Sequence, residues 1–334
     1  MVLVNKFEKD KKMISFIVIG KNEAKNISRC FKSIRKTIEY NKLTKYEVIY
    51  VDSNSTDNSI EIAKSFKGID IFKITGVCNA AIGRNIGAKE SKGNVLFFID
   101  GDMEIMPEFL PLVYSENNGL KYNFVSGQFI DVKYTHKGEF IEKVPYYRDL
   151  NCDKYFSTTG GIFLITRELW NLVDGMKNKY KRSQEVEFAL RLSKKGFLLL
   201  RKKETIAKHY TVDYMDSKRM WKMLFGGYHF YARGLLYREH IFNKYIYKII
   251  IRNDSTFVML IFFTTLSIIF NCPMIYYLYL FSIISRVLLQ REKNLLNVII
   301  KILYHIIMDL NTIFSFFFFY PREIKKYEIK YTKV

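Results

Sequence analysis

The stretch Gly93-Asn-Val-Leu-Phe-Phe-Ile-Asp-Gly-Asp-Met-Glu104 shapes the interpretation of the rest of the sequence. Residues 95–99 form an unbroken apolar run with β-branched and aromatic side chains. A short run of this kind, without polar alternation, is typical of a strand buried on both faces in a parallel sheet. The run ends abruptly at Asp100-Gly101-Asp102. Two carboxylates are therefore predicted at the carboxyl end of a buried strand.

The two aspartates are candidate ligands of a divalent cation. Residues two apart on an extended backbone point the same way, so the carboxylates of Asp100 and Asp102 can converge. In open α/β sheets, ligands bind outside the carboxyl ends of the strands. Oxygen ligands there suit Mg²⁺ or Mn²⁺ that carries a phosphate group. The alternative is a solvated turn after a strand, which an isolated Asp-X-Asp would favour.

Apolar runs and helical patterns alternate through the first half of the sequence. The predicted strands are residues 14–19, 47–51 and 69–74, and the predicted helices are 27–38, 60–66 and 79–91. Pro107 is expected to start the next helix, because proline suits a first-turn position. The alternation predicts an α/β fold with a mostly parallel sheet and right-handed crossovers.

The composition limits the class of protein. The chain has 334 residues and a formal net charge of +20, which suggests nucleic acid, an anionic membrane or acidic substrates as partners. Its four cysteines are scattered without a Cys-x-x-Cys, so neither a zinc site nor a disulfide framework is predicted. Residues 1–12 are polar and lysine-rich, and we expect no signal peptide there.

Several motifs, taken in order, resemble those of family 2 glycosyltransferases with the GT-A fold. They are Val18-Ile-Gly-Lys-Asn-Glu23, Val51-Asp-Ser-Asn-Ser-Thr-Asp57, Gly83-Arg-Asn-Ile-Gly87, Phe98-Ile-Asp-Gly-Asp102, Thr159-Gly-Gly-Ile-Phe-Leu-Ile-Thr-Arg167 and Gln184-Glu-Val-Glu-Phe-Ala-Leu-Arg-Leu192, followed by Gly196. The resemblance covers residues 13–215. It implies a Rossmann-like, mostly parallel sheet with flanking helices. Two departures are Ser53, where the family often has a second Asp, and Gln184-Glu185, where it has Glu-Asp.

The resemblance implies roles for two carboxylates at strand ends. Asp52 is implied to bind the nucleotide base or ribose, and Glu23 to help hold the nucleoside. A carboxylate in such a place can accept hydrogen bonds from these groups. The alternatives are a helix N-cap for Asp52 and a first-turn glutamate that complements a helix dipole for Glu23.

Further roles concern the diphosphate and the metal. Arg84, between two glycines that permit close approach, is expected to meet the pyrophosphate, with a helix-surface arginine as the alternative. Asp102 is the expected direct ligand of Mg²⁺ or Mn²⁺, while Asp100 reaches the ribose or the metal. His209 is placed like the late histidine that reaches the metal or diphosphate in many GT-A enzymes, although a lone histidine can be structural. The metal's task is to neutralise charge on the departing diphosphate.

Glu185 is the candidate general base that takes a proton from the acceptor hydroxyl, and Glu187 is its competitor. On a helix the two lie on different faces, so only one can point into the site. The alternative for Glu185 is a structural ion pair with Arg191 or Lys181.

Gly160 and Gly161 precede a predicted strand at 162–165. Without a Cβ they are expected to let the backbone approach the donor sugar closely, whereas a plain turn is the alternative. The stretch before them has a mixed polar and aromatic composition. Candidates there for the acceptor side are Tyr146, Tyr147, Arg148 and Asp149.

The last third of the chain is predicted to be membrane-associated. Residues 216–254 are basic and aromatic, 255–320 hold three apolar stretches, and 321–334 form a basic tail. The positive-inside rule places the outer ends of the first two stretches in the cytoplasm. The third, 295–320, is expected to be re-entrant or interfacial, with the tail cytoplasmic. The alternative is a soluble helical hairpin. Attachment to an anionic membrane explains the positive charge without nucleic acid.

The sequence therefore predicts a metal-dependent, inverting glycosyltransferase at the cell membrane, with its catalytic domain on the cytoplasmic side. The donor is expected to be a nucleotide sugar, uridine-linked on family frequency, and the acceptor a lipid-linked or polysaccharide glycan. The alternatives are an inactive membrane scaffold that binds nucleotide sugar, which Ser53 and Gln184 favour, and a sugar nucleotidyltransferase. The latter would usually have a glycine-rich loop after the first strand.

Overall fold

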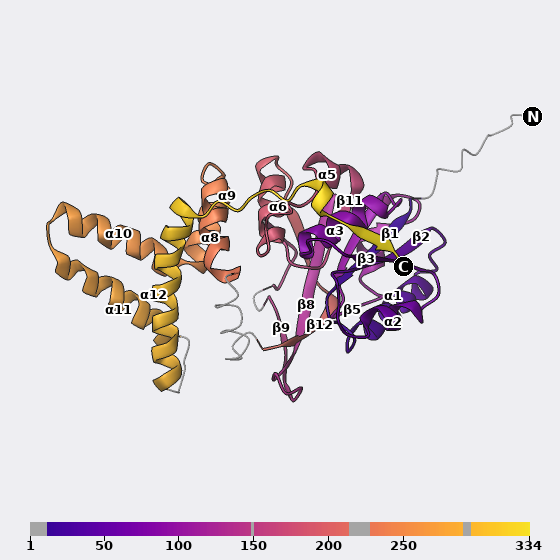
Figure 1. The fold of residues 1–334 in the computed structure, drawn as a ribbon, viewed down its shortest axis with the longest axis horizontal. Helices are drawn as coiled ribbons and strands as arrows, with labels where there is room; N and C mark the ends of the chain where they lie inside the picture. The colour runs from indigo at the N-terminus through magenta and orange to yellow at the C-terminus, as the bar shows by residue number, and fades with distance from the viewer. Residues whose placement is uncertain (1–11, 148–149, 214–227, 290–294) are drawn as a thin grey trace, which may run out of the picture. The chain divides into compact units, whose positions relative to one another are not determined.

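The computed structural model describes residues 12–147, 150–213, 228–289 and 295–334 (Figure 1). The chain forms two compact units. Unit 1 comprises Met1–Trp221 together with Arg322–Val334, and unit 2 comprises Lys222–Pro321. The segment that the sequence suggested as a basic tail thus belongs to unit 1, where part of it forms a strand.

Unit 1 is built on a mixed sheet with the strand order β10-β12-β8-β11-β4-β1-β2-β3-β13 over the described residues. The parallel core is β1 (Ile14–Gly20), β2 (Tyr46–Asp52), β3 (Ile69–Ile74) and β4 (Val95–Asp100). The remaining strands are β5 (Met103–Ile105), β8 (Phe124–Tyr134), β9 (Phe140–Pro145), β10 (Lys154–Phe156), β11 (Phe163–Thr166), β12 (Leu199–Val212) and β13 (Tyr331–Lys333), with a small separate pair, β6 (Tyr114–Ser115) and β7 (Gly119–Leu120). The predicted α/β fold with its buried parallel strands is confirmed.

Helices cover both faces of this sheet. They are α1 (Ile27–Tyr40), α2 (Ser59–Lys64), α3 (Ala80–Glu90), α4 (Leu110–Val113), α5 (Arg167–Leu172) and α6 (Gln184–Lys194). Alternate residues of β1 separate the two apolar layers, because Phe16 packs in the cluster of α1 and Ile17 in the cluster of α3, α5 and α6. In the second cluster Phe98 stacks on Trp170 with ring centroids 4.6 Å apart. Burial on both faces explains why the strands lack polar alternation.

The predicted helix start at Pro107 is wrong. After β4 the chain first forms β5, which pairs antiparallel with β12, and Pro107 lies in the turn that follows. Helix α4 begins only at Leu110, with Pro111 in its first turn. Pairing with a strand from residues 199–212 extends the chain here, and a local helix signal carries no information about such a distant partner.

Unit 2 is helical in its described part. Its helices are α8 (Tyr228–Glu239), α9 (Lys244–Asn253), α10 (Ser255–Ile269), α11 (Tyr276–Leu289) and α12 (Leu295–Phe318), with a short η1 (Pro273–Ile275) at the predicted break after α10. Among the described residues, Val298–Phe318 is the one helix long and apolar enough to cross a membrane by itself. Helices α9 and α10 meet that test only together, and they are bent by 97°.

Candidate active site

The carboxyl end of β4 gathers three carboxylates. Gly101 donates its backbone N–H to the carbonyl of Ile19 at 2.8 Å, which holds the Asp-Gly-Asp turn against the end of β1. A Cβ on Gly101 would lie 3.2 Å from Cγ of Glu23, so this glycine makes room for Glu23 beside the two aspartates. Burial, helped by the charge of Asp102, raises the pKa of Glu23 to about 7. Glu23 lies four residues before α1, outside the first turn of that helix.

Arg84 links this strand end to helix α6. Its Nη2 lies 2.7 Å from Oδ1 of Asp100 and its Nη1 lies 2.8 Å from Oε1 of Glu185. The side chain is only 1% exposed, so the guanidinium bridges two carboxylates inside the protein. The alternative of a helix-surface arginine is therefore wrong, and the contact with a pyrophosphate stays a prediction.

The two glycines near Arg84 lie against side chains of strand β1. A Cβ on Gly87 would lie 2.2 Å from Cγ2 of Ile17 on β1, and one on Gly83 would lie 3.3 Å from Cγ2 of Ile19. They therefore let α3 approach β1 closely. This approach places Arg84 at the end of β4.

The two glutamates of α6 lie on different faces, as predicted. Glu185 faces Arg84 and is 18% exposed. Glu187 is fully buried, and Arg191 donates to it from Nε at 2.8 Å and from Nη2 at 2.9 Å. Lys177 lies 3.3 Å from the same carboxylate. Glu187 is therefore the structural ion-pair partner, and Glu185 is the one at the site.

The two candidate glycines differ in what surrounds them. A Cβ on Gly161 would lie 1.8 Å from Oδ2 of Asp100, so only a glycine allows that carboxylate to rest against the backbone. A Cβ on Gly160 would meet nothing closer than the hydroxyl of Tyr147 at 3.7 Å. The close approach predicted for this pair is thus made by Gly161, and its partner here is Asp100.

His209 reaches the site from β12. The strand pairs with β5 and β8 together, and this register sets His209 opposite Met103 on one side and Asp131 on the other. Its Nε2 lies 3.2 Å from Oδ2 of Asp102, and its Nδ1 lies 2.9 Å from Oδ1 of Asp131. Burial lowers the pKa of His209, but hydrogen bonds and charge from the two aspartates outweigh it and raise the pKa to about 10.

The residues around Asp102 fit a divalent cation. Its Oδ1 is buried and has no hydrogen-bond partner in the described part of the chain. Asp131 holds Nδ1 of His209, an arrangement that commonly orients a metal-binding imidazole. Among the described residues no three His, Cys, Asp or Glu side chains are arranged so that they could hold a metal ion by themselves. Asp102 and His209 would thus supply two ligands, and Mg²⁺ often completes such a set with water and substrate phosphates.

The carboxylate of Asp52, at the end of β2, is hydrogen-bonded by groups of the protein. Its carboxylate is fully buried, and it accepts hydrogen bonds from the hydroxyl of Tyr50 at 3.0 Å and from the backbone N–H and hydroxyl of Ser55. Helix α2 begins after Asn58, so Asp52 is not its N-cap either. Asp52 organises the loop after β2 through these hydrogen bonds.

Sequence reasoning missed Asp131 and Asn85. Asp131 carries no local motif, and only the pairing of β8 with β12 brings it to His209. Asn85 follows Arg84, and its side chain joins α3 to residue Met176 by two hydrogen bonds. On the suggested acceptor side, Tyr146 stacks on Phe129 with centroids 4.4 Å apart. Arg148 and Asp149 lie outside the described residues.

This mixed α/β sheet, with an Asp-Gly-Asp turn at the end of a central strand, is the architecture of a GT-A glycosyltransferase domain. Residues 15–167 match the profile of glycosyl transferase family 2. This part of the chain is therefore similar to the glycosyltransferase domains of that family.

Known relatives agree with this assignment. Glycosyltransferase AglE of Haloferax volcanii is 28% identical over 148 residues, which cover 43% of this chain and 48% of the relative. Poly(ribitol-phosphate) beta-N-acetylglucosaminyltransferase TarP of Staphylococcus aureus is 32% identical over 114 residues, 32% of this chain and 34% of TarP. The chain thus spans about a third to a half of these curated relatives. A crystal structure of GalNAc-T7 with UDP, GalNAc and Mn²⁺ covers 60% of this chain and 44% of its own, with a TM-score of 0.49 and 16% identity.

Proposed function

We propose that unit 1 transfers a sugar from a nucleoside-diphosphate sugar to an acceptor hydroxyl, with inversion at the anomeric carbon. The observation that carries the proposal is the bridge through Arg84, which joins Glu185 of α6 to Asp100 at the end of β4. Asp102 and His209 lie at the same strand end. A candidate base and a candidate metal site therefore belong to one polar cluster, as transfer from a diphosphate requires.

In this reaction Glu185 accepts the proton of the acceptor hydroxyl while that oxygen attacks the anomeric carbon. A carbon–oxygen bond forms on one face as the bond to the diphosphate breaks on the other, which inverts the configuration. Arg84 donates a hydrogen bond from Nη1 to Oε1 of Glu185 and so fixes the position of this carboxylate. Glu187 is buried in its own ion pairs and is excluded from this role.

The donor end of the site is assigned to Glu23, Asp100, Asp102 and His209. Asp102 and His209 would hold Mg²⁺ or Mn²⁺, which supplies positive charge for the departing diphosphate when bound. Glu23 lies beside these aspartates and can accept a hydrogen bond from a ribose hydroxyl. We assign a uridine diphosphate donor.

Unit 2 is proposed to attach the enzyme to an anionic membrane, with unit 1 on the cytoplasmic side. Support comes from α12, whose residues Val298–Phe318 are long and apolar enough to span. Large apolar side chains are also exposed along α10, α11 and α12, among them Ile268, Tyr277, Phe281 and Leu303. Membrane attachment favours a lipid-linked or polysaccharide acceptor, and no nucleic-acid partner is assigned. We expect the protein to float with vesicles that contain phosphatidylglycerol. The protein without vesicles should not float.

The test of the donor site is thermal stabilisation of the detergent-solubilised protein by UDP or GDP, with and without Mn²⁺. A ligand that binds only the folded state raises the midpoint. We expect a Mn²⁺-dependent shift with UDP that is absent in Asp102→Ala. The rates at which the wild type and Glu185→Gln hydrolyse UDP-N-acetylglucosamine and UDP-glucose are then compared. Binding without turnover in the wild type would instead support an inactive scaffold, and pyrophosphate release from UTP would support a nucleotidyltransferase.

A further inference from the structure

The chain returns to unit 1 after the helical unit. We call residues 322–334 the strap. Its strand β13 pairs antiparallel with β3, with Tyr331 opposite Ile74 and Lys333 opposite Phe72. The backbone of the strap lies so close that a Cβ on Gly76 would be 2.3 Å from the carbonyl oxygen of Glu328. The strap is therefore fitted into unit 1 at the edge of the sheet (Figure 1, yellow).

Side chains of the strap contact α3, the helix that carries Arg84. Ile329 and Tyr331 pack against the cluster that contains Ile82 and Ile86 of α3. The hydroxyl of Tyr331 donates to Glu90 at 2.6 Å at the end of the same helix. The strap thus packs against α3 and is hydrogen-bonded to the last residue of that helix.

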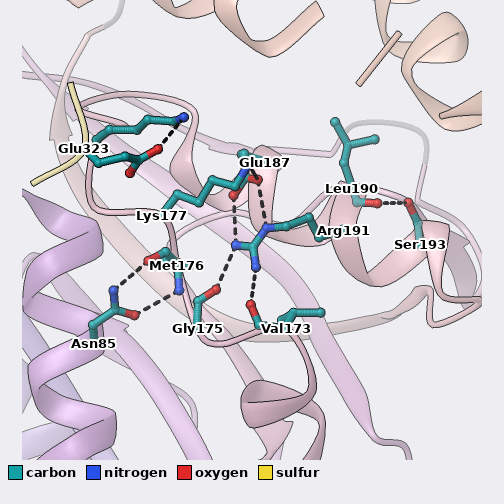
Figure 2. A network of polar contacts seen from close by, with 11 residues as sticks. Asn85, Val173, Gly175, Met176, Lys177, Glu187, Leu190, Arg191, Ser193 and Glu323 are labelled. Carbon is teal, nitrogen blue, oxygen red and sulfur yellow. Dashed lines mark hydrogen bonds and ion pairs between the residues drawn. The ribbon is translucent and has the colours of Figure 1, made fainter. Parts of the chain in front are cut away.

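The strap also contacts the loop that leads into α6. We call residues 173–183 the brace. Glu323 of the strap lies 2.6 Å from Nζ of Lys179 in the brace. Figure 2 shows Glu323 beside the brace, in the same network as Lys177 and Glu187. Glu185 follows Lys179 by six residues, so this ion pair joins the strap to the segment that presents the candidate base.

The brace itself is tied to α3 and α6 by polar contacts (Figure 2). Asn85 of α3 donates to the carbonyl of Met176 at 2.7 Å and accepts from its N–H at 2.9 Å. Arg191 of α6 donates to the carbonyls of Val173 and Gly175. The brace therefore sets the distance between the helix of Arg84 and the helix of Glu185.

A cavity of about 880 Å³ is lined by residues of the strap, the brace and α3. It is lined by Asn85, Met176 and Lys177 on one side and by Glu323 and Ile329 of the strap on the other. On this side the brace has open space in place of a packed core. Its position there depends on polar contacts, and the ion pair of Glu323 with Lys179 is one that comes from the strap.

We propose that the strap is a positioning element of the transferase site: through Glu323 and Lys179 it holds the brace so that Glu185 stays aligned with Arg84. The strap touches no reacting atom. The proposal rests on the proposed function for its catalytic consequence, whereas its structural consequence is independent of that function. It gives the segment after unit 2 a part in positioning the candidate base.

The test compares charge reversals at the two ends of the strap. Glu323→Lys breaks the pair with Lys179, and the matched control Lys333→Glu breaks the pair with Asp70, whose ions are 2.6 Å apart at the sheet edge. Hydrogen exchange is measured on the ligand-free protein. We expect amides of 173–188 to exchange about two- to fivefold faster in Glu323→Lys, as the loss of one surface pair implies. Lys333→Glu leaves them unchanged, and the double variant Lys179→Glu/Glu323→Lys restores the wild-type rates.

A purely structural strap would give a different pattern. Unchanged exchange over 173–188 in Glu323→Lys, an equal change in Lys333→Glu, or no restoration in the double variant overturns the proposal. In the hydrolysis of UDP-N-acetylglucosamine we expect kcat to fall two- to fivefold in Glu323→Lys, with KM for the donor unchanged. If the wild type neither binds UDP nor turns over, the proposed function fails, and the exchange data still decide the role of the strap.

Discussion

The ends of strands β2 and β4 place aspartates at the same edge of one sheet, and the two ends differ in what surrounds the carboxylates. Asp52 at the end of β2 is fully buried and satisfied by Tyr50 and Ser55. Asp100 and Asp102, at and after the end of β4, keep 31% and 23% of their side-chain surface exposed. Sequence position makes the two strand ends equivalent, whereas packing makes one structural and leaves the other available to ligands.

The difference shows that hydrogen-bond satisfaction decides the role of a carboxylate. A buried acceptor whose lone pairs are filled by the protein stabilises its loop, because unfolding exchanges those bonds for water at a net loss. A carboxylate with an unfilled oxygen retains a binding capacity, as Oδ1 of Asp102 does among the described residues. The same contrast recurs on α6, between Glu187 and Glu185.

The largest expected effect is a difference between substitutions of the aspartates at the ends of β4 and β2. Asp102→Asn should lower the rate of donor hydrolysis by about 10² to 10³-fold, the range seen when a group that stabilises developing charge is removed, with little change in the melting temperature. Asp52→Asn should lower the free energy of unfolding by about 1 to 3 kcal/mol and leave the rate per folded molecule unchanged. Initial rates and denaturation curves of both variants check this, and equal rate losses would contradict the contrast.

The next largest effect applies the contrast to α6. Glu187→Gln leaves Arg191 without its buried anion and should lower the free energy of unfolding by about 3 kcal/mol. Glu185→Gln keeps an oxygen toward Arg84, which stays paired with Asp100, so its stability should change much less while transfer is lost. Chemical denaturation and turnover are measured on both. A stable Glu187→Gln would show that the pair is exposed in solution.

A smaller effect tests Asp131, which orients His209 at the proposed metal site. Asp131→Asn removes the anion that orients His209 and should weaken Mn²⁺ binding about 10- to 100-fold. Because one of its two carboxylate partners is lost, the pKa of His209 should fall from about 10 toward its ordinary value. Electron paramagnetic resonance of free Mn²⁺ and NMR titration of the imidazole measure these changes. Unaltered Mn²⁺ affinity would exclude His209 as a ligand.

The smallest expected effect concerns the two neighbouring glycines. Gly161→Ala forces a Cβ into Oδ2 of Asp100 and should cost about 1 to 2 kcal/mol of stability through the displaced carboxylate. Gly160→Ala meets ordinary contact distances and serves as the matched control. Thermal denaturation and UDP binding are compared. If Gly160→Ala is the more damaging change, the backbone at 160 has a role that contacts do not explain.

Local patterns were enough to predict most of the fold. The strands β1 to β4, the buried face of α1 and the helix α3 follow from patterns in residues close in sequence. The opposite faces of Glu185 and Glu187 follow from helical geometry. The placement of His209 near Asp102 came from the resemblance to a family, since nothing local links residues 107 positions apart.

What escaped prediction depends on contacts between distant segments. Asp131 reaches His209 only through the register of β8 with β12. The burial of Asp52 depends on how Tyr50 and the loop after β2 close over it, and the burial of Arg84 on two glycines that meet β1. The role of residues 322–334 was missed because a short, basic segment carries no strand signal until an open sheet edge is offered to it.

The insertion of unit 2 between β12 and β13 also has a consequence for biosynthesis. Ribosomes add roughly 5 to 20 residues per second, and domains begin to fold as they emerge. Because Lys222–Pro321 lies before β13 in the sequence, the edge of the sheet at β3 stays unpaired for about 5 to 20 s after β12 has been made. An open edge is prone to wrong pairing. Cells in which the synthesis of the apolar helices is slowed are therefore expected to accumulate protein with an incomplete, aggregation-prone sheet.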